Sequence, residues 1–164
     1  MDAKNRFETR TTFLLLRLEW LGGLVVCAVL AVWHFSEIRW GVFVALFVVI
    51  DVIGYLPGAL AFRRSRSGCI SRWYFVAYNT MHSLVTAGVV AGVWALLAGP
   101  EWALLALPLH LLGDRALFGN SLKPFGVLFE PDPHPAYVEF ERAYSHSAGI
   151  DSEESRRGAD AVRL

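Results

Sequence analysis

The sequence predicts an all-α, polytopic membrane protein with four transmembrane helices and both termini in the cytoplasm. Of its 164 residues, 55% are hydrophobic, above the roughly 45–50% of an ordinary soluble domain. The mean hydropathy is +0.42. Four apolar runs each approach the roughly 17–25 residues that a helix needs to cross the hydrocarbon core. The predicted spans are residues 12–33, 40–62, 73–98 and 102–118, of which the last is the shortest.

Cations at the ends of these runs predict the orientation. Lys4 and Arg6 precede the first run, and a cluster of arginines fills the connection between the second and the third. The other two connections are short and poor in cations. Because cytoplasmic connections are enriched in Lys and Arg, both termini are expected inside. We therefore expect a multi-pass protein of the cell inner (plasma) membrane.

Composition changes after the fourth run. Residues 1–123 are predicted to form the transmembrane domain, and residues 124–164 a cytoplasmic tail rich in proline. Proline cannot donate a backbone hydrogen bond, so a continuous helix is excluded at the start of the tail. A short amphipathic helix is predicted at residues 135–146, where aromatic side chains recur at helical spacing. The polar residues 149–164 are expected to be disordered.

Each predicted span also carries an ionisable group well inside it. Such groups are costly in hydrocarbon, so they usually face a protein interior and often mark a functional site. With about 1.5 Å of rise per residue, their depths fall within roughly 11 Å of one another along the membrane normal. One shared pocket in the inner half of the bilayer is therefore expected. The candidate catalytic residues are Glu19, Asp51, His82, His110 and Asp114.

Neighbouring side chains are candidates for substrate contact. Helical spacing places some of them on the same face as the ionisable groups, and two tryptophans could supply pocket rings. Arg115 could bind an anionic head group that enters the pocket. Pro108 is expected to loosen the fourth helix just before His110 and free backbone carbonyls for the site. The candidate substrate-binding residues are Tyr55, Tyr78, Asn79, Arg115, Trp20 and Trp94.

Four segments together resemble a family of small four-helix bacterial integral-membrane proteins of unknown function. They are LRLEWLGG, IDVIGYLPG, YNTMHSL and LHLLGDRALFGNSLKPFG, and the resemblance covers about three quarters of the chain. The family usually has Leu-Gly-Tyr-Gly closely after Asp-Arg, whereas this chain reads DRALFGNSLK, which implies a divergent member. The resemblance implies a shared site and supplies no reaction. The motif positions are Glu19, Asp51, Gly54, Tyr55, Asn79, His82, His110, Asp114, Arg115, Gly119, Leu122 and Lys123.

Two kinds of chemistry fit these residue types. His82, His110, Asp114, Asp51 and Glu19 could hold one or two divalent metals and support hydrolysis or redox chemistry. Without a metal, a desolvated aspartic acid could act as a general acid while a histidine takes the proton back. Aromatic rings around it could stabilise a carbocation, as in an isoprenoid (terpene) cyclase or isomerase. The sequence thus favours a membrane-embedded enzyme acting on a lipophilic, isoprenoid-like or lipid-like substrate.

Three other interpretations stay open. Each polar group could be a structural link between helices, worth about 1 kcal/mol. Buried acids and histidines also serve proton-coupled or ion-coupled transporters, and a four-helix unit could be an accessory subunit of a membrane complex. The expected partners are membrane lipid and a lipophilic small molecule, without nucleic acid. A divalent metal is the one cofactor that these residues suggest, and the sequence decides neither its presence nor the oligomeric state.

Overall fold

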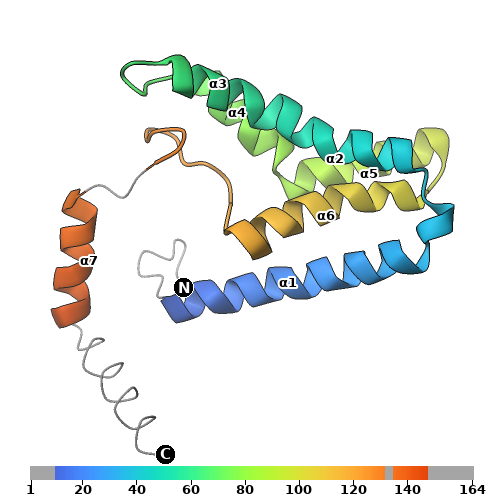
Figure 1. Cartoon of the computed structure of the whole chain (residues 1–164), viewed down its shortest axis with the longest axis horizontal. Coiled ribbons are helices and arrows are strands. Elements are labelled where there is room, and N and C mark those ends of the chain that lie inside the picture. Colours follow the sequence, from blue (N-terminus) through green and yellow to red (C-terminus); the bar gives the residue numbers. More distant parts are fainter. Residues whose placement is uncertain (1–9, 132–134, 148–164) are drawn as a thin grey trace, which may run out of the picture. The chain divides into compact units, whose positions relative to one another are not determined.

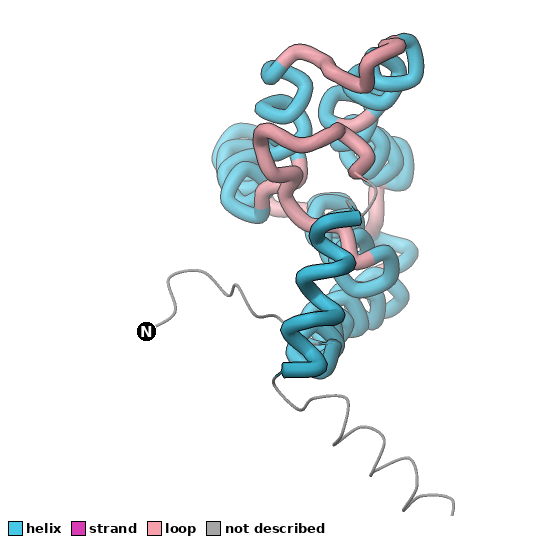
Figure 2. The backbone as a smooth tube through the Cα atoms, turned by 90° about the vertical axis from the view of Figure 1, so that its left-hand side faces the viewer, coloured by secondary structure: helices cyan, strands magenta, loops and turns pink. Residues whose placement is uncertain are grey.

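The structure, a computed structural model, describes residues 10–131 and 135–147. Those residues form helices and loops without a strand, so the all-α class is confirmed for them (Figure 2). The chain divides into two compact units, Met1–Phe129 and Glu130–Leu164. The first unit reaches beyond the predicted boundary at residue 123, because the side chain of Phe129 is fully buried within it.

The first two predicted spans are helices long and apolar enough to cross a membrane, at Thr11–Trp33 and Trp40–Arg64. The second is interrupted at Tyr55, where Pro57 follows in the first turn of the next helix. Proline has no N–H to continue the helical ladder, which accounts for the break. The elements are α1 (Arg10–Trp33), η1 (Phe35–Glu37), α2 (Trp40–Gly54) and α3 (Leu56–Arg64).

The third predicted span is not one straight helix. It consists of α4 (Arg72–Met81) and α5 (Leu84–Ala98), which meet at an angle of 58°. Together they form either a broken span or a re-entrant loop. Ser83 explains the break: its backbone is extended and its side chain accepts the N–H of Val85, as an N-cap does. His82 therefore lies at a helix end.

The fourth predicted run is divided into three pieces: η2 (Trp102–Leu105), α6 (Ala106–Gly113) and the π-helical turn η3 (Asp114–Phe118). Pro108 was expected to disturb the helix just before His110. The run changes from η2 to α6 at Ala106, two residues before Pro108, which lies in the first turn of α6, where a missing N–H costs little. The helix then continues through His110. The irregular turn comes later, at Asp114, and ends at Gly119 in the left-handed region (φ +72°).

Helix α6 is the centre of the first unit, between α1 and α2 (Figure 1). Helix α4 packs on α2, and α5 packs on α6. One apolar cluster joins Ile50, Ala87, Leu107 and Leu111 from α2, α5 and α6. The shortest predicted span is thus the one that the others surround.

A second apolar cluster closes one end of this unit. The segment that follows η3 runs back over α3 and α4 and places Phe129 against Ala59, Phe75 and Tyr78. Gly58 makes this approach possible, because a Cβ there would lie only 2.4 Å from the Phe129 ring. The end of the first unit is therefore packed on the helices and does not hang free as a tail.

The second unit contains α7 (Pro135–Ser147), close to the helix predicted at residues 135–146. Tyr137, Phe140 and Tyr144 are exposed on it. The predicted disorder of residues 149–164 lies outside the described residues.

Candidate functional site

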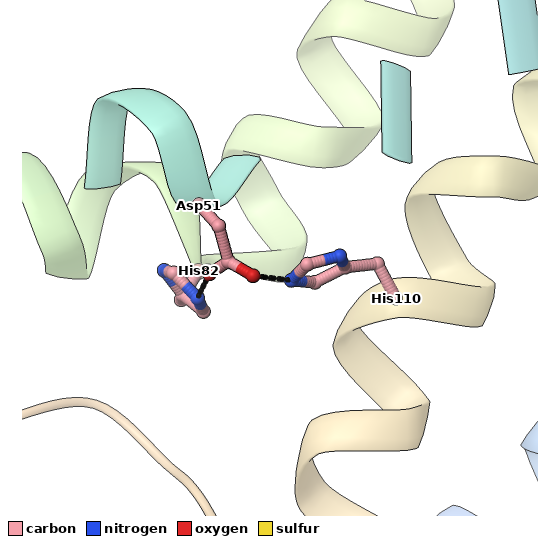
Figure 3. Close-up of side chains that lie close together, drawn as sticks. All are labelled: Asp51, His82 and His110. Atoms are coloured by element: carbon pink, nitrogen blue, oxygen red, sulfur yellow. Dashed lines mark ion pairs between the residues drawn. The ribbon is translucent and has the colours of Figure 1, made fainter. Parts of the chain in front are cut away.

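Four of the five predicted polar residues meet in space. Asp51 on α2 reaches toward His82 at the α4–α5 break and toward His110 on α6 (Figure 3). Its two oxygens lie 3.3 Å from His82 Nε2 and 3.7 Å from His110 Nε2. Asp114 Oδ2 approaches the same two nitrogens, at 3.4 and 3.7 Å. Two carboxylates therefore flank a pair of imidazoles drawn from three parts of the chain.

The orientation of His82 is fixed by the turn that precedes it. Its Nδ1 lies 3.0 Å from the carbonyl oxygen of Tyr78, which can only accept, so Nδ1 carries the proton. The ring also stacks on the Tyr78 ring at 3.9 Å between centroids. In the neutral imidazole Nε2 is then a lone-pair donor facing the carboxylates, the arrangement found in metal-ligating histidines.

His110 has no such support. The side chain is 5% exposed, and neither ring nitrogen has a hydrogen-bond partner among the described residues. Phe47 covers one side of the ring, edge to face, at 4.7 Å between centroids. Its Nε2 faces Asp51 and Asp114 at 3.7 Å, which is too far for a hydrogen bond. A buried nitrogen without a hydrogen bond is costly, so Nε2 is an atom that a ligand would satisfy.

The donor atoms have a spacing that suits one metal ion. Asp51, His82 and His110 each offer one ligand atom, a carboxylate oxygen or a ring nitrogen, and these three atoms lie within 4.8 Å of one another. Donors around a tetrahedral ion are about 3.4 Å apart, because each lies about 2.1 Å from the metal. The distances from the Asp51 oxygens to His82 and His110, 3.3 and 3.7 Å, bracket that value. Asp51 is half exposed and so remains accessible.

Glu19 is not part of this group. It is exposed on α1, and it forms no hydrogen bond or ion pair with any residue of the described range 10–131. The face of α1 that packs on α6 contains Arg17, Trp20 and Gly23. Glu19 precedes Gly23 by four residues and so lies at the edge of that face, about 40° around the helix from Gly23, where its side chain is exposed.

Two of the candidate substrate-binding residues border the cluster through aromatic contacts. Tyr78 is buried against His82, and Tyr55 lies edge to face against Tyr78 at 6.5 Å between centroids. Both also pack on Phe129. They form an apolar wall on the side of the cluster that faces the 119–129 segment.

Asn79 holds the chain in place. Its side-chain amide donates to the carbonyl oxygen of Lys123 at 2.8 Å, and its Oδ1 accepts the N–H of Lys123 at 2.7 Å. These two bonds anchor the segment that carries Phe129. The structure thus gives Asn79 and Lys123 a positioning role.

Trp20 and Arg115 form a pair beside the cluster. The Arg115 guanidinium lies 4.6 Å above the Trp20 ring and donates to the His82 carbonyl at 3.3 Å. The cation thus bridges α1 to the α4–α5 break. Both residues lie where the sequence placed them, near the acid and histidine groups.

Trp94 lies elsewhere, at the opposite end of the first unit. Its Nε1 donates to Glu101, which also pairs with Arg39. The Arg39 guanidinium lowers the pKa of the Glu101 carboxyl below its ordinary value of 4.5. At the same end His34 stacks on Trp102 at 3.7 Å between centroids. Because an indole N–H needs an acceptor, Trp94 is directed to this loop network and not to the site.

The candidate site residues did not include the chain beyond η3, although the resemblance named Gly119, Leu122 and Lys123 as motif positions. Asn120 and Ser121 line a narrow crevice beside His82 and Asp114, and Lys123 Nζ lies 4.3 Å from the Phe129 ring centroid. For Asn120, Ser121 and Phe129 the local signal was the break from apolar to polar residues at Gly119. The chain itself matches no family model, no curated protein and no solved structure. The resemblance to small four-helix membrane proteins therefore stays a prediction.

Proposed function

We propose that this protein is a membrane-embedded, metal-dependent enzyme that hydrolyses a lipophilic substrate. The observation that carries the proposal is the convergence of Asp51, His82 and His110, with His110 buried and without a hydrogen-bond partner in the described chain. Two imidazoles and one carboxylate are a donor set found in catalytic zinc sites, where a fourth position takes water or substrate.

Each residue has a role in this proposal. Asp51, His82 and His110 would hold the ion, which would supply a water nucleophile near neutral pH. Asp114, close to both histidines, would act as the general base that accepts a proton from the attacking water. Asp114 would then give this proton to the leaving group, which restores its carboxylate.

A four-span topology with both termini inside also forms part of the proposal. Two to three segments qualify as spans by length and composition. A fourth span from η2 to η3 is supported by the contacts at its two ends. Its start is hydrogen-bonded to the α1–α2 connection and its end to the start of α1, so it runs alongside the length of α1. Among the described cations of the first unit, Arg39 alone lies at the end with Trp102. The excess of cations at the other end supports a cytoplasmic location for it.

The transport alternative has less support. A path across the membrane needs polar groups along its length. Within the described part of the first unit, the acids and histidines other than Glu19 gather at one level or in the two short connections. Those connections are tied together by the Arg39–Glu101 pair and by the hydrogen bond from Trp102 to Glu37. This favours a pocket entered from one side.

The test is metal binding by purified protein in a neutral detergent, read by native mass spectrometry, with unfolding temperature as the folding control. After exposure to zinc or manganese and removal of excess ion, we expect one divalent ion per chain. Asp51→Asn and His110→Ala should weaken binding by at least about 100-fold, because each removes a ligand. Glu19→Gln is the matched control and should bind as tightly as the parent.

Two results would contradict the proposal. One is a folded parent protein that retains neither ion. The other is a folded His110→Ala variant that binds the ion as tightly as the parent, which would make the cluster a structural link between helices.

A further inference from the structure

A cavity of about 380 Å³ lies between α1, the π-helical turn η3 and residues 119–122. This volume is within the roughly 300–1,000 Å³ of small-molecule sites. Phe13, Leu16, Trp20 and Leu122 give it apolar walls. It is a half-open space beside the acid and histidine cluster, and the proposed chemistry does not use it.

Two arginines line this cavity, and neither pairs with a carboxylate of the described residues. Arg17 donates to the carbonyl oxygens of Ala116 and Leu117, at 2.9 and 2.6 Å. Arg115 donates to the carbonyl oxygen of His82. Within the described residues neither guanidinium forms an ion pair at 4.0 Å or less. Because a guanidinium has five N–H donors, each retains donors for an oxyanion.

Arg115 connects the cavity to the cluster. A narrow crevice lined by Tyr78, His82 and Asp114 shares Arg115, Asn120 and Ser121 with the cavity. The crevice is too narrow to hold a water molecule, and Arg115 lies between the two spaces together with Asn120 and Ser121, which line both. An anion held by Arg115 would thus be adjacent to the residues that hold the metal.

The walls of the cavity indicate what the anion is attached to. Leu16 is 41% exposed, and its neighbours Leu15 and Leu18 are exposed as well, so the cavity opens onto an apolar face of α1. None of the apolar window of this helix is buried within the protein, as expected for a surface that meets lipid chains. A ligand with an anionic head and an apolar chain would fit both the arginines of the cavity and the apolar face of α1.

We propose that the cavity binds the oxyanion head group, phosphate or carboxylate, of a single-chain membrane amphiphile. Arg17 and Arg115 hold the head, and the chain leaves between Leu16 and Leu122 along α1. That this amphiphile is the substrate rests on the proposed function. The binding itself does not require the metal.

The experiment titrates metal-free protein in a neutral detergent with dodecyl phosphate and follows tryptophan fluorescence, because Trp20 forms one wall. Dodecanoate tests the carboxylate head, dodecanol removes the charge, and inorganic phosphate removes the chain. We expect saturable binding of dodecyl phosphate, dodecanoate or both, and a signal that is lost in Trp20→Phe. Arg115→Gln should weaken binding at least tenfold, which corresponds to about 1.4 kcal/mol. The control Arg66→Gln removes an exposed cation from the α3–α4 connection and should change affinity less than twofold.

A second variant protects the test if Arg115→Gln does not fold. Ser121→Phe adds bulk to the cavity from an exposed position without adding an indole, and it should also weaken binding at least tenfold. The inference is overturned if dodecanol binds as tightly as the anions, or if inorganic phosphate alone matches dodecyl phosphate. It is equally overturned if folded Arg115→Gln and Ser121→Phe both keep full affinity. Since titration is done without metal, loss of this binding and loss of the metal site are seen separately.

Discussion

Substitution of Gly54 tests how closely α2 approaches the α4–α5 break. Gly54 is buried at the end of α2. A Cβ added there would lie 2.9 Å from the Met81 Cβ and 3.1 Å from two atoms of the His82 ring. Ordinary contacts of a Cβ begin at 3.4 Å, so Gly54→Ala must move the helices or the imidazole by about 0.5 Å. The Met81 Cβ is fixed to the backbone and cannot turn away.

The expected cost follows from this overlap. Overpacking of a filled interior typically costs about 1–3 kcal/mol. Alanine in a helix gains about 0.5–1 kcal/mol over glycine. Gly88→Ala on α5 is the matched control, because no atom outside its own helix lies within 4 Å of the added Cβ and only the gain remains. The two variants should therefore differ in unfolding free energy by about 1–3 kcal/mol.

The assay is thermal unfolding of both variants in the same detergent, followed by metal binding at a temperature where both are folded. Gly54→Ala should have the lower unfolding temperature and should bind the ion less tightly, since it displaces His82. The reasoning would be refuted if Gly54→Ala were at least as stable as Gly88→Ala and bound the metal as tightly as the parent.

Three further outcomes are expected. Phe129→Ala should lower stability by about 3–5 kcal/mol because it empties a fully buried position, while Phe125→Ala, at 47% exposure, should cost less than half as much; equal losses in denaturant unfolding would contradict this. The backbone N–H of Lys123 donates to Asn79, so Asn79→Ala should speed hydrogen exchange of that amide with little change elsewhere in the first unit. Unchanged exchange at Lys123 would argue against the anchor. The Arg39 guanidinium lowers the pKa of Glu101, so ionised Glu101 contributes stability above its ordinary pKa of 4.5, and this contribution is lost as the pH falls further. Glu101→Gln should therefore reduce the fall in unfolding temperature at acid pH. An unchanged fall would refute the assignment.

Local sequence signals accounted for the extent of α1 and of the combined α2 and α3. Long apolar runs depend only on the chain itself, so hydropathy was sufficient for them. The break at Ser83 had a local signal as well, a serine that can cap the next helix, but the apolar character around it concealed this. Pro108 marks the start of α6 and leaves the helix intact at His110, because the effect of a proline depends on its position within the helix, and here it lies in the first turn.

The candidate site was predictable in its residue types and only partly in its membership. Asp51, His82, His110 and Asp114 come together as expected from the cost of ionisable groups in hydrocarbon. The same rule selected Glu19, which is exposed. Hydropathy gives the depth of a residue along a helix, but not the direction in which its side chain points around the helix axis.

By itself, the sequence determined the all-α class, the main apolar helices and the chemical types of the groups that meet inside. Only the tertiary structure decided which helix is central, that Trp94 belongs to the loop network at Glu101, and that Phe129 closes the end of the first unit. It also decided that two arginines share a cavity with Trp20. The physical reason is that composition and periodicity act within one element. The rotation of helices about their axes and the path of the chain after them are set by packing between elements distant in sequence.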